Sequence, residues 1–174
     1  MPATDKAGRL PRSTGRGTMG TDDIEFIDRL NQCCDFIRQR QFYGREDRAH
    51  ITWASAAAGE LIAEILVTDE HIGAAGCIDE GWLGTMLDNL TAMLIQCTPN
   101  GYGNSVSTSI SIQSVSPISP GTLVAIHACS SGMRARQPHA TAIFSDKNCP
   151  ERVYAVGTHT KFVKPDLALS APRL

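Results

Sequence analysis

Asp88 is a carboxylate in the middle of the mostly apolar stretch GCIDEGWLGTMLDNLTAMLIQC, residues 76–97. If this stretch is a helix, the neighbours of Asp88 three and four positions away are all small. They are Gly84, Thr85, Thr91 and Ala92. Small side chains allow a ligand or another subunit to approach the helix closely, so Asp88 would lie in a partly desolvated groove. A carboxylate in such a groove can serve as a general base or a nucleophile. A solvated helix face is the alternative explanation of the same residue.

The Gly-rich loop HIGAAGC, residues 71–77, leads into this stretch. The first backbone N–H groups of a helix have no partner within the helix, so they can bind an anion or a developing oxyanion. Asp88 would lie about two turns from these donors. Together, the loop and the carboxylate predict an acyl-transfer site.

The elements that would position these groups follow from the spacing of apolar residues and turn signals. Helical periodicity predicts helices over residues 22–41 and 79–96. Gly59 divides residues 51–68 into two strands, and four more strand-like runs follow at 105–116, 122–131, 140–146 and 152–163. In the first of these runs, Val106, Thr108, Ile110 and Ile112 should share one face and the serines the other. The order predicts an α+β fold with six antiparallel strands and one central helix.

The chain has 174 residues, a length that suits one domain, which we place at residues 22–165. Residues 1–21 are rich in Gly, Pro, Ser, Thr and Arg, so we expect a disordered tail, and residues 166–174 should form a flexible C-terminal tail. There is no basic run interleaved with aromatic residues, so a nucleic-acid partner is not expected. There is also no long apolar run, so a membrane span is not expected.

The six cysteines include no C-x-x-C pair, and no Cys/His set has the sequence spacing of a zinc site, so no metal is expected. Cysteines used as small core residues favour a reduced, cytoplasmic protein. Two other compartments stay open. Lys6, Arg9, Arg12 and Arg16 are similar to a mitochondrial presequence, and the final Pro-Arg-Leu is similar to a peroxisomal signal.

Three motifs, in this order, resemble those of the hotdog-fold acyl-CoA thioesterases, and in particular the phenylacetate-pathway and mammalian thioesterase-superfamily types. They lie at Gly76 to Asn89, Val106 to Pro117 and Gly157 to Lys161, and the resemblance covers about residues 50–164. It implies a six-stranded sheet wrapped around a central helix, in a homodimer or a dimer of dimers. It also implies hydrolysis of a fatty or aryl acyl-thioester, carried by coenzyme A or by an acyl carrier protein, with no cofactor beyond the coenzyme A of the substrate.

The resemblance also implies catalytic roles. The family's carboxylate falls on Asp88, and its oxyanion-binding N–H falls on Glu80, next to Gly81 in the turn where the family has His-Gly-Gly. A hydroxyl that positions water falls on Ser107, which the neighbouring subunit would supply.

Two departures from the family concern the substrate. Asp79 and Glu80 replace the family's His-Gly, and Gly73 stands where the mammalian branch has an asparagine that orients water or the carbonyl. A backbone N–H persists at Glu80, and Asp79 is placed to cap the helix through the N–H of Gly81 or Trp82.

Basic residues near the end of the chain are candidates for the phosphates of coenzyme A, because guanidinium and ammonium groups bind phosphate well. These candidates are Arg134, Arg136, His139 and Lys161. Further substrate contacts are assigned to Gly73, Asp79, Trp82, Asn89 and Thr108. His159 is expected to be a hydrogen-bonded strand residue and not a catalyst.

Two other functions compete with hydrolysis. A dehydratase or lyase of a biosynthetic pathway could use Asp79 and Glu80 as its acid and base. A non-catalytic module could bind acyl-thioesters without turnover. This fold supports several chemistries, so the fold alone does not choose among them.

Overall fold

The computed structural model describes residues 20–39, 49–97, 105–131 and 136–163. The expected tails at 1–21 and 166–174 lie almost entirely outside these ranges. The described elements are helix α1 (Thr21–Gln39), strands β1 (His50–Ser55) and β2 (Glu60–Leu66), a 3-10 turn (Asp69–His71), helix α2 (Glu80–Cys97), and strands β3 (Ser105–Ser114), β4 (Leu123–Ser131), β5 (His139–Asp146) and β6 (Val153–Val163). This order confirms the predicted α+β fold, with element ends that differ by a few residues.

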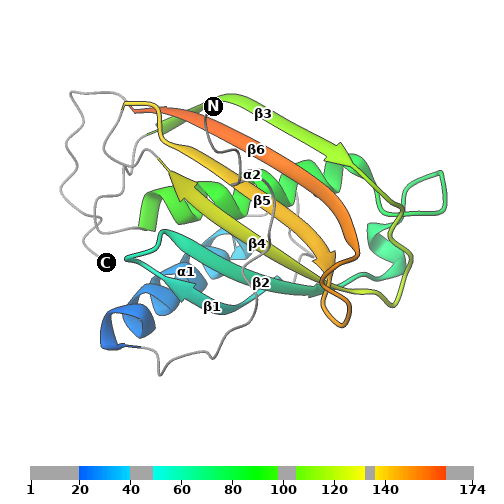
Figure 1. Ribbon diagram of the computed structural model, residues 1–174, viewed down its shortest axis with the longest axis horizontal. Coiled ribbons are helices and arrows are strands. Elements are labelled where there is room, and N and C mark those ends of the chain that lie inside the picture. The colour runs from blue at the N-terminus through cyan, green and yellow to red at the C-terminus, as the bar shows by residue number, and fades with distance from the viewer. Residues whose placement is uncertain (1–19, 40–48, 98–104, 132–135, 164–174) are drawn as a thin grey trace, which may run out of the picture.

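The strands form one antiparallel sheet in the order β1-β2-β4-β5-β6-β3. Figure 1 shows α2 running along one face of this sheet, with α1 beside the β1 end. Every second residue of the central strands faces α2 and is buried, as the alternation along β2 and β4 shows. Neither described helix is long and apolar enough to cross a membrane.

The core lies between the sheet and α2. The helix contributes its buried leucines and methionines, which pack on small and branched residues of the strands. Helix and sheet are in close contact at Gly157 of β6, where a Cβ atom would lie 2.5 Å from Leu87 Cδ2. A larger residue would collide with Leu87 unless Leu87 shifted. The contact brings the middle of α2 over the middle of β6.

Strand β3 differs from the sequence prediction in which side chains share a face. Ser107 pairs with Lys161, and Ser109 pairs with Thr160, so Thr108 is an extra residue in a β-bulge. A bulge reverses the alternation that follows it. As a result Ser107 shares the helix-facing side with Ile110 and Ile112, which pair with His159 and Gly157. The prediction that the serines and the isoleucines lie on opposite faces was therefore wrong for Ser107.

Candidate active site

Asp88 lies near the middle of α2, with 44% of its side chain exposed. The predicted space beside it is present at Gly84, where an added Cβ would meet nothing within 4 Å other than nearby helix backbone. On the sheet side, Asp88 Oδ1 is 3.6 Å from Nε2 of His159, which is longer than a hydrogen bond. One side of the carboxylate is thus open to a ligand, and the other borders buried polar groups of the sheet.

Those buried groups, together with the exposed Ser107 of β3, form a continuous polar row from β3 and β6 to α2. Ser107 Oγ lies 2.9 Å from His159 Nε2 and 3.2 Å from Lys161 Nζ. His159 Nδ1 lies 2.6 Å from Thr91 Oγ1, and the Thr91 hydroxyl donates to the carbonyl of Leu87 at 2.5 Å. His159 is fully buried, and Lys161 is 5% exposed. The row therefore places two buried basic side chains near Asp88, with the exposed hydroxyl of Ser107 at its outer end.

One arrangement of protons satisfies every member of this row. Because the Thr91 hydroxyl donates to Leu87, its oxygen must accept from Nδ1–H of His159. A neutral His159 then has a lone pair on Nε2, which accepts the hydroxyl proton of Ser107. The Ser107 oxygen accepts in turn from Lys161. Ser107 therefore holds a fixed orientation next to the carboxylate of its own chain, although the family resemblance assigned this hydroxyl to a neighbouring subunit.

Burial sets the charge states of the two bases. It is the largest cause of the lowered pKa of His159, and the nearby Lys161 lowers that pKa further, while Asp88 opposes both effects. Burial likewise lowers the pKa of Lys161, and the charge of Asp88 counteracts this shift. Asp88 thus favours the protonated forms of both bases.

The start of α2 is shaped by Asp79. Its Oδ1 accepts the N–H of Trp82 at 3.0 Å, which confirms the expected N-cap. A side chain at Gly81 would place its Cβ 2.9 Å from Asp79 Oδ1, and one at Gly73 would place its Cβ 3.2 Å from Asp79 Oδ2. The two glycines thus leave room for the cap. Glu80 and Gly81 are exposed, and their N–H groups lie in the first helical turn, where donors lack partners within the helix.

The side chain of Trp82 is buried and packs against His71, with ring centroids 4.9 Å apart. It belongs to the core cluster, together with the leucines of α2. Asn89 is half-buried on α2. The exposed Thr108 hydroxyl donates to the carbonyl of Thr160 at the bulge.

The four basic residues assigned to phosphates separate into two groups. Arg136 is exposed, and half-buried His139 contacts the Thr160 hydroxyl through Nδ1 at 2.9 Å, so these two remain near the surface. Lys161 instead points into the row beneath Asp88. Arg134 lies outside the described residues. The structure thus places Lys161 with the catalytic candidates and not with the surface cations.

The sequence did not predict a role for Thr91, and it did not predict that His159 contacts the site. Thr91 was noticed only as a small neighbour of Asp88, yet it fixes the tautomer of His159. The predicted character of His159, a strand residue with satisfied hydrogen bonds, is confirmed, but those bonds connect it to the site. Strand alternation could have indicated this, because Gly157, His159 and Lys161 recur at every second position of one strand.

These groups can act on an acyl carbon. The half-exposed carboxylate of Asp88 can take a proton from water or attack the carbon directly. The hydroxyl of Ser107 lies nearby in a fixed orientation. The helix N–H groups two turns away can bind a developing oxyanion.

Comparison with known proteins supports this chemistry. No family model matches the chain. Human acyl-coenzyme A thioesterase 13 is 30% identical over 112 residues, which span 64% of this chain and 78% of that protein. The crystal structure of mouse thioesterase superfamily member 2 superposes with a TM-score of 0.67 at 21% identity, and the match covers 84% of this chain and 100% of that one. A Streptococcus mutans protein whose structure contains acetyl-CoA gives a TM-score of 0.60 at 17% identity, covering 67% of this chain and 89% of that one.

Proposed function

The chain belongs to the acyl-CoA thioesterase family of hotdog-fold proteins, and we propose that it hydrolyses acyl-CoA by means of the carboxylate of Asp88. The observation that carries this assignment of roles is the position of Asp88. It is open to a ligand on one side, borders the polar row of Ser107, His159 and Lys161 on the other, and lies two turns from the start of α2.

In the proposed reaction, Asp88 removes a proton from a water molecule that attacks the thioester carbon. The carbonyl oxygen becomes an oxyanion, which accepts hydrogen bonds from the N–H groups of Glu80 and Gly81. The oxyanion then re-forms the carbonyl as the carbon–sulfur bond breaks, the proton held by Asp88 passes to the leaving thiolate, and the acid and coenzyme A are released. We propose that this needs no cofactor beyond the coenzyme A of the substrate.

The polar row supports the carboxylate in this scheme. The negative charge of Asp88 counteracts the burial that lowers the pKa of Lys161, so the protonated lysine is favoured beside the carboxylate. His159 accepts the Ser107 proton and so fixes the direction of that hydroxyl. We propose that the Ser107 oxygen helps to hold the attacking water.

The substrate is proposed to enter from the exposed side of α2, with its phosphates near Arg136 and His139, the two basic residues near the surface among the described candidates. The acetyl-CoA in the similar Streptococcus mutans structure favours coenzyme A over a carrier protein. The lyase alternative loses support, because Asp79, one of its two proposed acid–base groups, is engaged as the helix cap.

We also propose that the chain forms a homodimer through β3. This strand is at the edge of the sheet, is ten residues long, and carries exposed apolar side chains such as Val106 at 63% and Ile110 at 42%. A long apolar edge strand is a ready template for pairing with a second copy. The cytoplasm remains the proposed compartment.

Release of free thiol from short, long and aryl acyl-CoAs by wild type and Asp88→Asn tests the proposed function. We expect kcat to fall by about 10²–10⁴-fold in the variant, the range for loss of a general base. Asp28→Asn is a matched control, because Asp28 is an exposed aspartate on the other helix, α1. Activity that survives in Asp88→Asn would remove Asp88 from the mechanism, and an inactive, folded wild type would favour the binding-module alternative.

A further inference from the structure

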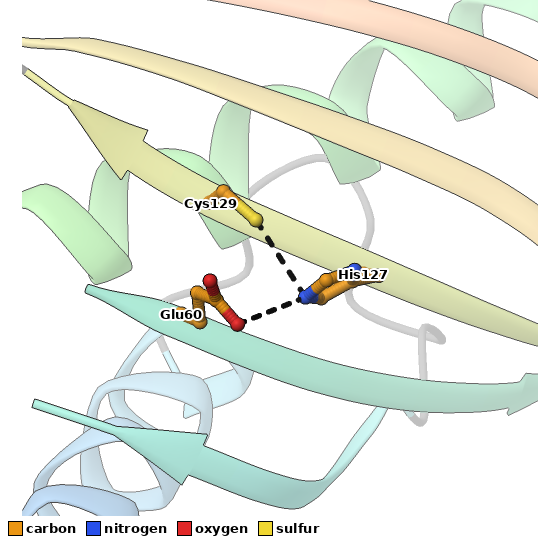
Figure 2. A group of neighbouring side chains, drawn as sticks. All are labelled: Glu60, His127 and Cys129. Atoms are coloured by element: carbon orange, nitrogen blue, oxygen red, sulfur yellow. Dashed lines mark hydrogen bonds and ion pairs between the residues drawn. The ribbon is translucent and has the colours of Figure 1, made fainter. Parts of the chain in front are cut away.

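A second cluster of reactive side chains lies on the face of the sheet that points away from α2. Glu60 of β2 and Cys129 of β4 are directly opposite each other, and His127 is two residues before Cys129 on the same face. Figure 2 shows the carboxylate of Glu60 and the sulfur of Cys129 both approaching one nitrogen of His127. All three side chains are partly buried, and their ligand atoms lie within 4.8 Å of one another. We propose that these three residues bind a zinc ion.

The distances between the ligand atoms fit metal ligation. His127 Nε2 is 3.4 Å from Glu60 Oε2 and 3.6 Å from Cys129 Sγ. The first distance exceeds the usual length of a hydrogen bond between nitrogen and oxygen. Around a tetrahedral zinc with ordinary bond lengths, the N···O and N···S separations are about 3.4 Å and about 3.5 Å. The two distances that meet at His127 Nε2 thus already match two edges of such a site.

Without an ion, hydrogen bonds link the three side chains, since Glu60 also contacts Cys129. Nε2 carries either one proton or one lone pair, so it serves only one of its two neighbours at a time. A zinc ion between the three atoms would bond to all of them. Binding would displace the thiol proton of Cys129 to solvent, and the charges of thiolate and carboxylate would balance the ion.

The surroundings of the cluster favour a fixed, partly dry site. The ligands come from two neighbouring strands whose backbone pairing fixes their spacing. His127 is flanked on that face by Ile62 of β2 and Ile143 of β5, its partners in the two ladders. His127 is 16% exposed and Glu60 is 33% exposed, so solvent can supply a fourth ligand. The set of one nitrogen, one sulfur and one oxygen suits zinc, which is of intermediate softness.

The site was not visible in the sequence, because Glu60 and His127 are 67 positions apart and the H-x-C pair alone has no zinc spacing. It is also separate from the proposed hydrolysis, because its side chains point away from α2 and Asp88. The ion would connect β2 to β4 as a cross-strand link.

Titration of the reduced, metal-free full-length protein with Co²⁺ tests this site without reference to activity. We expect one equivalent to produce a thiolate-to-cobalt charge-transfer band together with the strong visible bands of a four-coordinate ion, and Zn²⁺ to abolish both. Cys129→Ser should lose the charge-transfer band. Glu60→Gln and His127→Gln should weaken cobalt binding by more than an order of magnitude.

The matched control is Cys149→Ser, because Cys149 is an exposed cysteine away from the cluster. This variant should bind cobalt like wild type. Circular dichroism would check that each variant keeps its sheet. A wild type without the charge-transfer band would overturn the proposal. A band that persists in Cys129→Ser, or disappears in Cys33→Ser, would also overturn it, because cobalt would then occupy other sulfurs.

Discussion

The hydrogen bonds of the polar row at the site depend on the protonation state of His159. His159 contacts Thr91 and Ser107 directly, and the charged groups that act on its pKa are Lys161, Asp88 and His139. In the neutral form, His159 of β6 donates one hydrogen bond to Thr91 of α2 and accepts one from Ser107 of β3. If the ring were protonated, Nε2 could no longer accept the hydroxyl proton of Ser107. The ring would also place a second positive charge beside Lys161.

This gives a prediction about stability and pH. The pKa of His159 is lowered from its ordinary value of 6.5, so the unfolded chain binds more protons at this group than the folded protein as the pH falls below that value. The free energy of unfolding should therefore decrease as the pH falls through 6.5 toward the folded-state pKa. In urea denaturation, His159→Gln should lose less stability than wild type between about pH 7 and about pH 5. Equal losses in the two proteins would contradict the prediction.

Ser107 and Thr108 are neighbours with different predicted effects. Ser107→Ala removes the hydroxyl beneath Asp88 and a partner of both His159 and Lys161, so we expect kcat to fall by about 10²-fold or more, as for loss of an electrostatic donor. Thr108→Ala removes an exposed bond to the Thr160 carbonyl and should cost at most about 1 kcal/mol of stability. Steady-state kinetics and denaturation of both variants would check this. Similar kcat values for the two would show that the Ser107 hydroxyl is not part of the mechanism.

At the scale of elements, the start of α2 permits a test of the proposed oxyanion donor. Glu80 is the first helical residue and follows the Asp79 cap. Proline is well tolerated at this position, because its fixed φ suits the helix. Glu80→Pro therefore removes a backbone N–H while leaving the helix intact, and we expect kcat to fall by about 10²–10³-fold.

The control for this variant is Glu80→Ala, which keeps the N–H and removes an exposed carboxylate. It should keep its kcat and, like most surface changes, alter stability by less than about 0.5 kcal/mol. If the alanine variant lost as much activity as the proline variant, the side chain of Glu80 and not its N–H would be the functional group.

Strand β3 was predicted from the sequence, but its bulge was not. The alternation of serines with valine and isoleucine located the strand, and the central helix followed from its leucines and methionines. The bulge at Thr108 was not predictable, because one extra residue leaves no mark in composition or period. The contact between Ser107 and His159, 52 positions apart, depends on that bulge. Asp88 and the Asp79 cap could be predicted because both depend on local helix geometry.

For the whole molecule, the free edge of β3 makes oligomerisation testable. Val106→Lys places a charge on this edge, and charged edge strands resist pairing. We expect sedimentation velocity to show a dimer for wild type and a shift toward monomer for the variant. Leu66→Lys is the control, because Leu66 is an exposed apolar residue at the end of β2 and should leave the dimer unchanged. A monomeric wild type at micromolar concentration would contradict the proposal.

The close contact at Gly157 has a consequence for engineering. A side chain there would collide with the side chain of Leu87, the residue before Asp88, so that Leu87 or the backbone of α2 would have to shift. A mutant library meant to broaden the range of accepted substrates should therefore keep position 157 constant. Gly84 is the better position to diversify, because it lies on the same helix as Asp88 and a new side chain there starts in open space.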